Sequence, residues 1–255
     1  MKELSVVLLG AGNVAAFFLH NMLKHGIRVE RIIARDAEKV QALAAGTGTA
    51  WSTDFSELGD EGNIIVSAVK DSAARELWSR CDFGGRLVLH TAGTLPIDAL
   101  KPFAPDCGVL YPLQTISARR VIDSRNVPLL IEANDEKNLA RLKILAEALS
   151  ENVREVNSDS RKKLHLAAVF ANNFSNLCFH IAWEMLEQQQ LDPEILLPLI
   201  DETCAKLHTI PPALAQTGPA VRWDENVMNF HLDMLKDDPE LAELYRVLSA
   251  AIHRR

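Results

Sequence analysis

The chain of 255 residues is long enough for one large domain or for two of modest size. Hydrophobic residues make up 48% of it and charged residues 24%, as is typical of a globular protein that buries a substantial core. The formal net charge of −7 weighs against a nucleic-acid-binding protein, which would present a basic face, but it allows a local basic pocket for a small anion.

The cysteines and the N-terminal segment indicate the compartment. The four cysteines are scattered, without a C-x-x-C pair or the spacing of metal ligands, so we expect no metal site and a reducing environment. The apolar run at the N-terminus ends in glycines rather than in a small-residue cleavage site. We therefore predict a cytoplasmic protein.

One segment has the length of a membrane span, because residues 164–183 contain no Asp, Glu, Lys or Arg. Several polar side chains would nevertheless be costly in lipid. They are His165, Asn172, Asn173, Ser175, Asn176 and His180. We predict a long helix that is buried against protein, and no membrane segment.

The first half of the chain alternates short apolar runs with helical patterns, as strand–helix–strand units do. Near-continuous apolar runs such as VVLL favour parallel strands that are covered on both faces. The strands are predicted at 5–9, 29–34, 49–51, 63–69, 87–90, 108–110, 127–132 and 153–156. The helices between them are predicted at 13–25, 37–45, 73–78 and 135–150.

After residue 156 the pattern becomes purely helical. Ser158 or Asp159 supplies the N-cap of the long helix, and the segments Asp192-Pro193-Glu194 and Asp238-Pro239-Glu240 mark two further helix starts. We therefore predict an α/β domain with a Rossmann-type parallel sheet at 1–157 and an all-α domain at 158–255.

The strongest local signal is a glycine-rich turn after the first strand. In VVLLGAGNVA, a G-x-G-x-x-A pattern lies between a buried strand and an apolar helix. Gly10 permits the tight turn, Gly12 lets the backbone approach a pyrophosphate, and Ala15 keeps the helix close to the sheet. The alternatives are a glycine turn in an unrelated α/β protein and the first turn of a methyltransferase. The predicted dinucleotide-binding residues are Gly10, Ala11, Gly12, Asn13, Val14 and Ala15.

The end of the second strand indicates which dinucleotide binds. Arg35 stands 20 residues after Ala15, where an acid would bind the ribose 2′-hydroxyl of NAD and an arginine can pair with the 2′-phosphate of NADP. Asp36 is either the ribose ligand after a shift of one residue or the cap of the next helix. We predict NADP(H).

Two further strand ends carry polar or reactive side chains. Ligands of doubly wound sheets bind beyond the carboxyl ends of the strands. We therefore assign Val69 and Thr91 to cofactor binding and take Lys70 and His90 as catalytic candidates. His90 can donate a proton to a carbonyl oxygen as hydride arrives, or its ring can simply be held by the backbone. Lys70 is alternatively a solvated loop charge.

Asn172 is the third catalytic candidate. Together with Asn173 it interrupts the apolar run of the long helix, and His165 lies about two turns earlier. Buried amides need partners, which either a ligand or packing between helices can supply.

Several segments together resemble a family of Rossmann-like NADP oxidoreductases whose helical C-terminal domain has no assigned function. Members commonly read HTSG, HPLQTF and LTGPxxRGD where this chain has HTAG, YPLQTI and QTGPAVRWD. Tyr111 thus replaces a histidine and Trp223 a glycine. The resembling segments span nearly the whole chain and are GAGNVA at 10–15, HTAGTLPIDAL at 90–100, YPLQTIS at 111–117, LAAVFANNF at 166–174 and QTGPAVRWD at 216–224.

In its layout the chain is similar to pyrroline-5-carboxylate reductase, 3-hydroxyisobutyrate dehydrogenase and ketopantoate reductase. The last two have a lysine one turn before an asparagine of the long helix, and Ala168 and Val169 occupy that turn here. The resemblance implies a nicotinamide-facing cleft between two domains. It places His90 and Asn172 there as catalytic candidates, with Tyr111, Gln114 and Arg222 as substrate-binding ones. Arg222 either holds a substrate carboxylate or pairs with a neighbouring acid.

The function expected from these features is hydride transfer between NADP(H) and a small carbonyl, imine or hydroxy substrate, such as a 2-oxo acid. The alternatives are a reductase that passes hydride between a deazaflavin and NADP, and a non-catalytic NADP-sensing protein. We also expect a homodimer formed through the helices, because so long an apolar helix is hard to bury within one small domain. Neither a nucleic acid nor a membrane is an expected partner.

Overall fold

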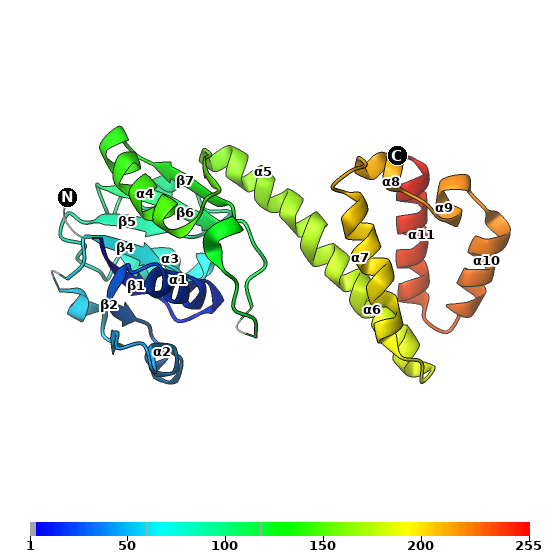
Figure 1. Cartoon of the computed structure of the whole chain (residues 1–255), viewed down its shortest axis with the longest axis horizontal. Coiled ribbons are helices and arrows are strands. Elements are labelled where there is room, and N and C mark those ends of the chain that lie inside the picture. Colours follow the sequence, from blue (N-terminus) through cyan, green and yellow to red (C-terminus); the bar gives the residue numbers. More distant parts are fainter. Residues whose placement is uncertain (1–3, 60, 118) are drawn as a thin grey trace. The chain divides into compact units, whose positions relative to one another are not determined.

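The computed structural model describes residues 4–59, 61–117 and 119–255. The chain divides into two compact units, Met1–Leu177 and Cys178–Arg255. The first unit is built on an eight-stranded sheet with the strand order β3-β2-β1-β4-β5-β6-β7-β8 (Figure 1). Its strands are β1 (Ser5–Leu9), β2 (Arg28–Ile33), β3 (Ala50–Ser52), β4 (Ile64–Ser67), β5 (Leu87–His90), β6 (Cys107–Pro112), β7 (Leu129–Ala133) and β8 (Val153–Glu155).

All eight predicted strands are present, and the Rossmann-type α/β prediction is confirmed. The predicted parallel sheet is parallel except at one pair, where β7 runs antiparallel to β6. Parallel neighbours need a crossover, usually through a helix. The described residues between β6 and β7 form only one short 3₁₀ helix, η3 (Ser124–Asn126), and the chain returns in the opposite direction.

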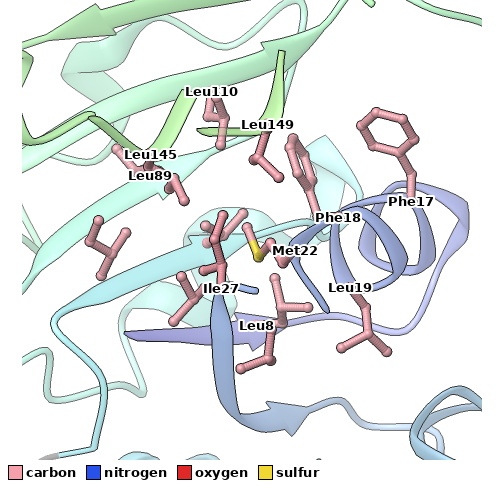
Figure 2. Packing of buried hydrophobic residues seen from close by; sticks show 14 of the residues in the cluster. Leu8, Phe17, Phe18, Leu19, Met22, Ile27, Leu89, Leu110, Leu145 and Leu149 are labelled. Carbon is pink, nitrogen blue, oxygen red and sulfur yellow. The ribbon is translucent and has the colours of Figure 1, made fainter. Parts of the chain in front are cut away.

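Helices cover the sheet on both sides, which explains the uninterrupted apolar run of β1. Val6 and Leu8 pack in one hydrophobic cluster, whereas Val7 and Leu9 pack in the cluster on the opposite face. Figure 2 shows the first cluster, in which Leu8 lies near side chains of α1. The helices of this unit are α1 (Asn13–Lys24), α2 (Ala37–Ala44), α3 (Asp71–Trp78), α4 (Glu136–Leu149) and α5 (Ser158–Ala168), with 3₁₀ turns η1 (Phe55–Leu58) and η2 (Ile97–Ala99).

The predicted long helix extends from α5 through a π-helical turn, η4 (Val169–Phe174), into α6 (Ser175–Gln188). Its N-cap is neither Ser158 nor Asp159 but Asn157, whose side chain accepts a hydrogen bond from the amide of Ser160 at 2.9 Å. The hydroxyl of Ser158 instead donates to Glu132 at 2.7 Å. This hydroxyl therefore binds a side chain of β7 and does not cap the helix.

The second unit consists of helices only. Its predicted helix starts at Asp192 and Asp238 are confirmed, since each carboxylate accepts a hydrogen bond from an amide of the first turn. No helix in the described part of the chain is long and apolar enough to cross a membrane. After α6 come η5 (Pro193–Leu196), α7 (Leu197–Lys206), α8 (Pro212–Ala215), α9 (Pro219–Arg222), α10 (Glu225–Met234) and α11 (Pro239–His253).

The compact first unit continues past residue 157, the boundary predicted from the sequence. The helix α5 and the turn η4 belong to it, and the unit ends at Leu177 within α6. The division into domains at 1–157 and 158–255 stays a prediction about which segments fold independently.

A buried arginine fixes α5 to the sheet. The side chain of Arg161 is 0% exposed, and its guanidinium donates to the carboxylate of Glu132 on β7 at 2.5 Å. It also donates to the carbonyl of Leu95 at 2.5 Å and to the hydroxyl of Ser158 at 3.2 Å. A charge removed from water is tolerated only when it is paired in this way.

Replacing Arg161 tests how much this anchor contributes. We expect Arg161→Met to lower the free energy of unfolding by about 3–5 kcal/mol, because it leaves Glu132 without its buried partner. The exposed neighbour Lys162 is the matched control, and Lys162→Met is expected to change stability by less than about 0.5 kcal/mol. Urea denaturation measures both. Equal midpoints for the two variants would contradict an anchoring role.

Candidate active site

The glycine-rich turn has the geometry that a dinucleotide requires. Gly10 has a φ of +114°, and a Cβ there would lie 2.5 Å from the carbonyl oxygen of Ala68. Gly12 is the N-cap of α1, and a Cβ built on it meets nothing within 4 Å. Among the described residues no side chain caps α1, so its first-turn amides remain available for a phosphate.

The neighbouring residues of the motif hold this turn in place. Ala15 is fully buried, which brings α1 close to the sheet, while Ala11 and Val14 pack against the same hydrophobic cluster from its edge. Asn13 donates from its side chain to the carbonyl of Ile116 at 3.1 Å, which ties the start of α1 to the loop after β6. The six motif residues thus form one continuous segment from the carboxyl end of β1 into the first turn of α1.

At the end of β2, Arg35 and Asp36 differ in what they contact. The carboxylate of Asp36 accepts from the amide of Lys39 at 3.1 Å and pairs with its ammonium at 2.8 Å. The hydrogen bond to Lys39 also lowers the pKa of Asp36. Asp36 therefore caps α2, the second of its two predicted roles, while Arg35 is exposed.

The ends of β4 and β5 adjoin the turn. Val69 approaches Gly10 so closely that its Cγ1 would lie 3.3 Å from a Cβ at that glycine. The amide of Thr91 donates to the carbonyl of Ser67 at 3.2 Å. Val69 and Thr91 thus lie at the edge where the cofactor is expected, and Lys70 is an exposed residue at the N-terminus of α3.

His90 lies in an environment that does not favour proton donation. It is 1% exposed, and its Nδ1 accepts from the amide of Ala92 at 3.2 Å. Burial lowers the pKa of His90 to about 3, and repulsion by Arg161 adds to this, against the opposing effect of the backbone carbonyl of Pro96. The ring is neutral near pH 7, and its contact with the amide of Ala92 fits the alternative of a ring held by the backbone, while its role as a proton donor stays a prediction.

A tyrosine–histidine pair lies next to the end of β5. The hydroxyl of Tyr111, on β6, is 2.9 Å from Nδ1 of His165 on α5, and the two rings meet edge to face at 5.9 Å. Gly93 makes room for them, because a Cβ there would lie 2.6 Å from that Nδ1 and 3.2 Å from Cε2 of Tyr111. The HTAG and YPLQ motifs therefore meet at this point.

Three further predicted residues differ in their surroundings. Asn172 is half-buried in the π-helical turn η4, a type of turn frequent at functional sites. Gln114 is exposed, and its side chain accepts from the amide of Thr115 at 2.8 Å. Arg222 belongs to the second unit, is exposed, and makes no ion pair within 119–255. The roles of these three residues stay predictions.

Two contributors to the site were not identified as such from the sequence. Arg161 stands in the charged run SRKK, which has the composition of a solvated helix start. Its spacing of four residues from His165 was the available signal, since it places both side chains on one face of a helix. The role of Gly93 could be recognised only from the structure, because the contact that it permits comes from a residue 72 positions further along the chain.

Comparisons with known proteins agree with this architecture. The family "NADP oxidoreductase coenzyme F420-dependent" matches residues 5–93, and the domain of unknown function DUF2520 matches residues 127–252. The chain is 40% identical to a protein from Bacteroides fragilis described as a "putative NADP oxidoreductase", with a TM-score of 0.95 and 99% of each chain covered. A comparison with curated protein sequences gave no match.

More distant solved structures share the fold. A pyrroline-5-carboxylate reductase from Coxiella burnetii is 18% identical with a TM-score of 0.61, over 100% of this chain and 97% of the other. A reductive aminase from Aspergillus terreus, solved with NADPH, is 13% identical with a TM-score of 0.75, over 99% of this chain and 93% of the other.

The site and the fold thus define a nicotinamide-nucleotide oxidoreductase of the Rossmann class. By its full-length similarity to the Bacteroides fragilis protein, the chain belongs to the family of NADP oxidoreductases that combine this fold with the DUF2520 domain. The resemblance stated from the sequence motifs is confirmed, and so is NADP(H) as the cofactor.

The two glycines of the turn provide a pair of contrasting substitutions. We expect Gly10→Ala to lower the free energy of unfolding by roughly 1–3 kcal/mol, because of its positive φ and the collision with Ala68. Gly12→Ala should leave the unliganded protein about as stable as wild type, since its Cβ meets nothing, yet weaken NADPH binding by filling the pyrophosphate position.

Thermal denaturation without nucleotide and calorimetric titration with NADPH separate these two effects. Unchanged NADPH affinity in Gly12→Ala would contradict the placement of the pyrophosphate at this turn.

Proposed function

We propose that the protein transfers hydride reversibly between NADP(H) and a small carbonyl, imine or hydroxy compound, with 2-oxo acids as the first class to test. The observation that carries this proposal is the open turn at Gly12, which offers uncapped helix amides beside the ends of β4 and β5. Nucleotides of doubly wound folds bind at this edge of the sheet.

The residues present fit an NADP molecule. The turn at 10–15 would hold the pyrophosphate through backbone amides, and Arg35 would pair with the 2′-phosphate. Val69 and Thr91 would line the path toward the nicotinamide. When bound, the nicotinamide supplies the hydride, and the protein contributes binding, orientation and proton transfer.

A second enzymatic candidate is supported by the family match at 5–93, whose description names coenzyme F420. A reductase of that kind would pass hydride between a deazaflavin and NADP. NADPH consumption that depends on a carbonyl favours the first candidate, and consumption that depends on a deazaflavin favours the second. A protein that binds NADPH but consumes it with neither would be a sensor.

We further propose that two copies associate through the helical unit. Of the 78 residues at 178–255, all of which are described, only Ala220, Met228 and Ala242 are buried hydrophobic residues. Phe230 and Met234, one turn apart on α10, are 64% and 65% exposed. So large an apolar surface is typical of an interface, and a second copy of the chain is the partner that is always present.

Nucleotide preference tests the role of Arg35. We expect wild-type protein to bind NADPH more tightly than NADH, and Arg35→Ala to lose most of that preference while NADH affinity changes little, because only the 2′-phosphate contact disappears. Isothermal titration of both nucleotides measures this. Tighter NADH binding by the wild type would instead assign the ribose to Asp36.

Light scattering coupled to size-exclusion chromatography tests the association. We expect wild-type protein at twice the 28.2 kDa mass of one chain, and Phe230→Glu at or near the single-chain mass. Asn229→Glu, at the exposed neighbouring position, is the matched control and should remain dimeric. A single-chain mass for wild-type protein would refute the proposal.

A further inference from the structure

We propose that Tyr111 delivers the proton that accompanies hydride transfer, that His165 relays this proton from solvent, and that the substrate is therefore a carbonyl compound rather than an imine, which accepts hydride in its already protonated iminium form. This inference rests on the proposed function and narrows its substrate class. It is carried by the hydrogen bond of 2.9 Å between the Tyr111 hydroxyl and Nδ1 of His165.

The position of Tyr111 fits this role. In the register of the sheet, Val109 of β6 pairs with His90 of β5. Tyr111 comes two residues later, at the carboxyl edge where Thr91 follows β5 and the glycine turn follows β1. Hydride donors of this fold lie along the same edge. Both members of the pair are half-buried, which leaves them partly open to a ligand and to solvent.

Several features hold the two side chains together. His165 lies one helical turn after Arg161, and the buried bonds from Arg161 to Glu132 and Leu95 fix that turn against the sheet. Gly93 provides the space that the imidazole fills. A proton donor contributes to catalysis only when its geometry is set in advance, and here three separate segments set it.

The electrostatic surroundings keep the phenol protonated. Burial raises the pKa of Tyr111, Asp71 raises it further, and Arg161 opposes them. The carboxylate of Asp71 is itself hydrogen-bonded to the hydroxyl of Thr94. Tyr111 thus carries its proton near pH 7, whereas the lowered pKa of His90 leaves that imidazole neutral.

The proton balance of the step is simple. As the carbonyl carbon receives hydride, the C=O π bond breaks and its electron pair takes the proton of the Tyr111 hydroxyl. The phenolate oxygen then takes the proton from Nδ1 of His165, and Nε2 of His165 takes one from water. The net reaction consumes one hydride and one solvent proton and yields the alcohol. An imine takes up its proton beforehand, from solvent, to become an iminium ion, which gives a neutral amine on receiving hydride and needs no donor during the transfer.

The protein contains a matched control for the test. Its only other tyrosine, Tyr245, also lies 2.9 Å from a histidine Nδ1, that of His231, with the rings edge to face at 5.7 Å. That pair lies in the second unit. Tyr245→Phe therefore removes the same kind of hydrogen bond from a unit that contains neither the glycine-rich turn nor Tyr111.

The experiment follows NADPH consumption by the full-length protein with pyruvate, 2-oxobutyrate and succinic semialdehyde as carbonyl probes, and with pyrroline-5-carboxylate as the imine probe. We expect turnover of a carbonyl, a loss of roughly 100-fold or more in kcat for Tyr111→Phe, and no loss for Tyr245→Phe. NADPH affinity, measured by calorimetry, should be unchanged in both variants.

His165 is tested through readouts that a purely structural role would not change. In His165→Asn we expect kcat to fall and added imidazole to restore part of it. The solvent deuterium isotope effect on kcat should be present in wild type and altered in the variant.

The outcomes separate this inference from the function on which it rests. Turnover of the imine alone, or carbonyl turnover that Tyr111→Phe retains, would overturn the proton relay while leaving hydride transfer established. NADPH binding without consumption by any probe would overturn both proposals.

Discussion

The burial of one guanidinium group is the constraint on which the site depends. The side chain of Arg161 is fully buried. The free-energy cost of removing its charge from water is offset because Glu132, Leu95 and Ser158 accept its hydrogen bonds in fixed directions. These bonds set both the position and the rotation of α5 on the first unit. His165 is on the same helix face one turn later and consequently reaches Tyr111. Burial lowers the pKa of His90, and the charge of Arg161 lowers it further, so the arginine that positions His165 also disfavours protonation of His90.

Much of the first unit could be predicted because local patterns determine it. The apolar run of β1 contributes to two hydrophobic clusters. Gly10 adopts a positive φ that other residues disfavour, and Gly12 leaves the space beside its backbone open. The direction of β7 could not be predicted, since its sequence suits a strand of either orientation and the connecting loop decides. The N-cap of α5 is Asn157 rather than the predicted Ser158, because the hydroxyl of Ser158 donates to Glu132 instead.

The site shows a second limit of reasoning from sequence. His90 and His165 are the same residue type, each at the edge of an apolar segment, and only burial distinguishes a ring held by the backbone from one that reaches a hydroxyl. Trp223 stands where family members commonly have glycine. Its backbone is left-handed, with a φ of +51°, a conformation that glycine adopts most readily, and its ring lies 4.7 Å from that of His253.

We propose that NADP(H) and the proton donor meet at the carboxyl edge of β1, β4 and β5. Hydrogen–deuterium exchange of the full-length protein with and without NADPH tests this most directly. The account predicts slower exchange at 10–15, at 68–71 and at 90–93 when NADPH is bound, with smaller effects around Tyr111 and His165. Protection confined to residues 119–123, or to the helices of the second unit, would contradict this placement.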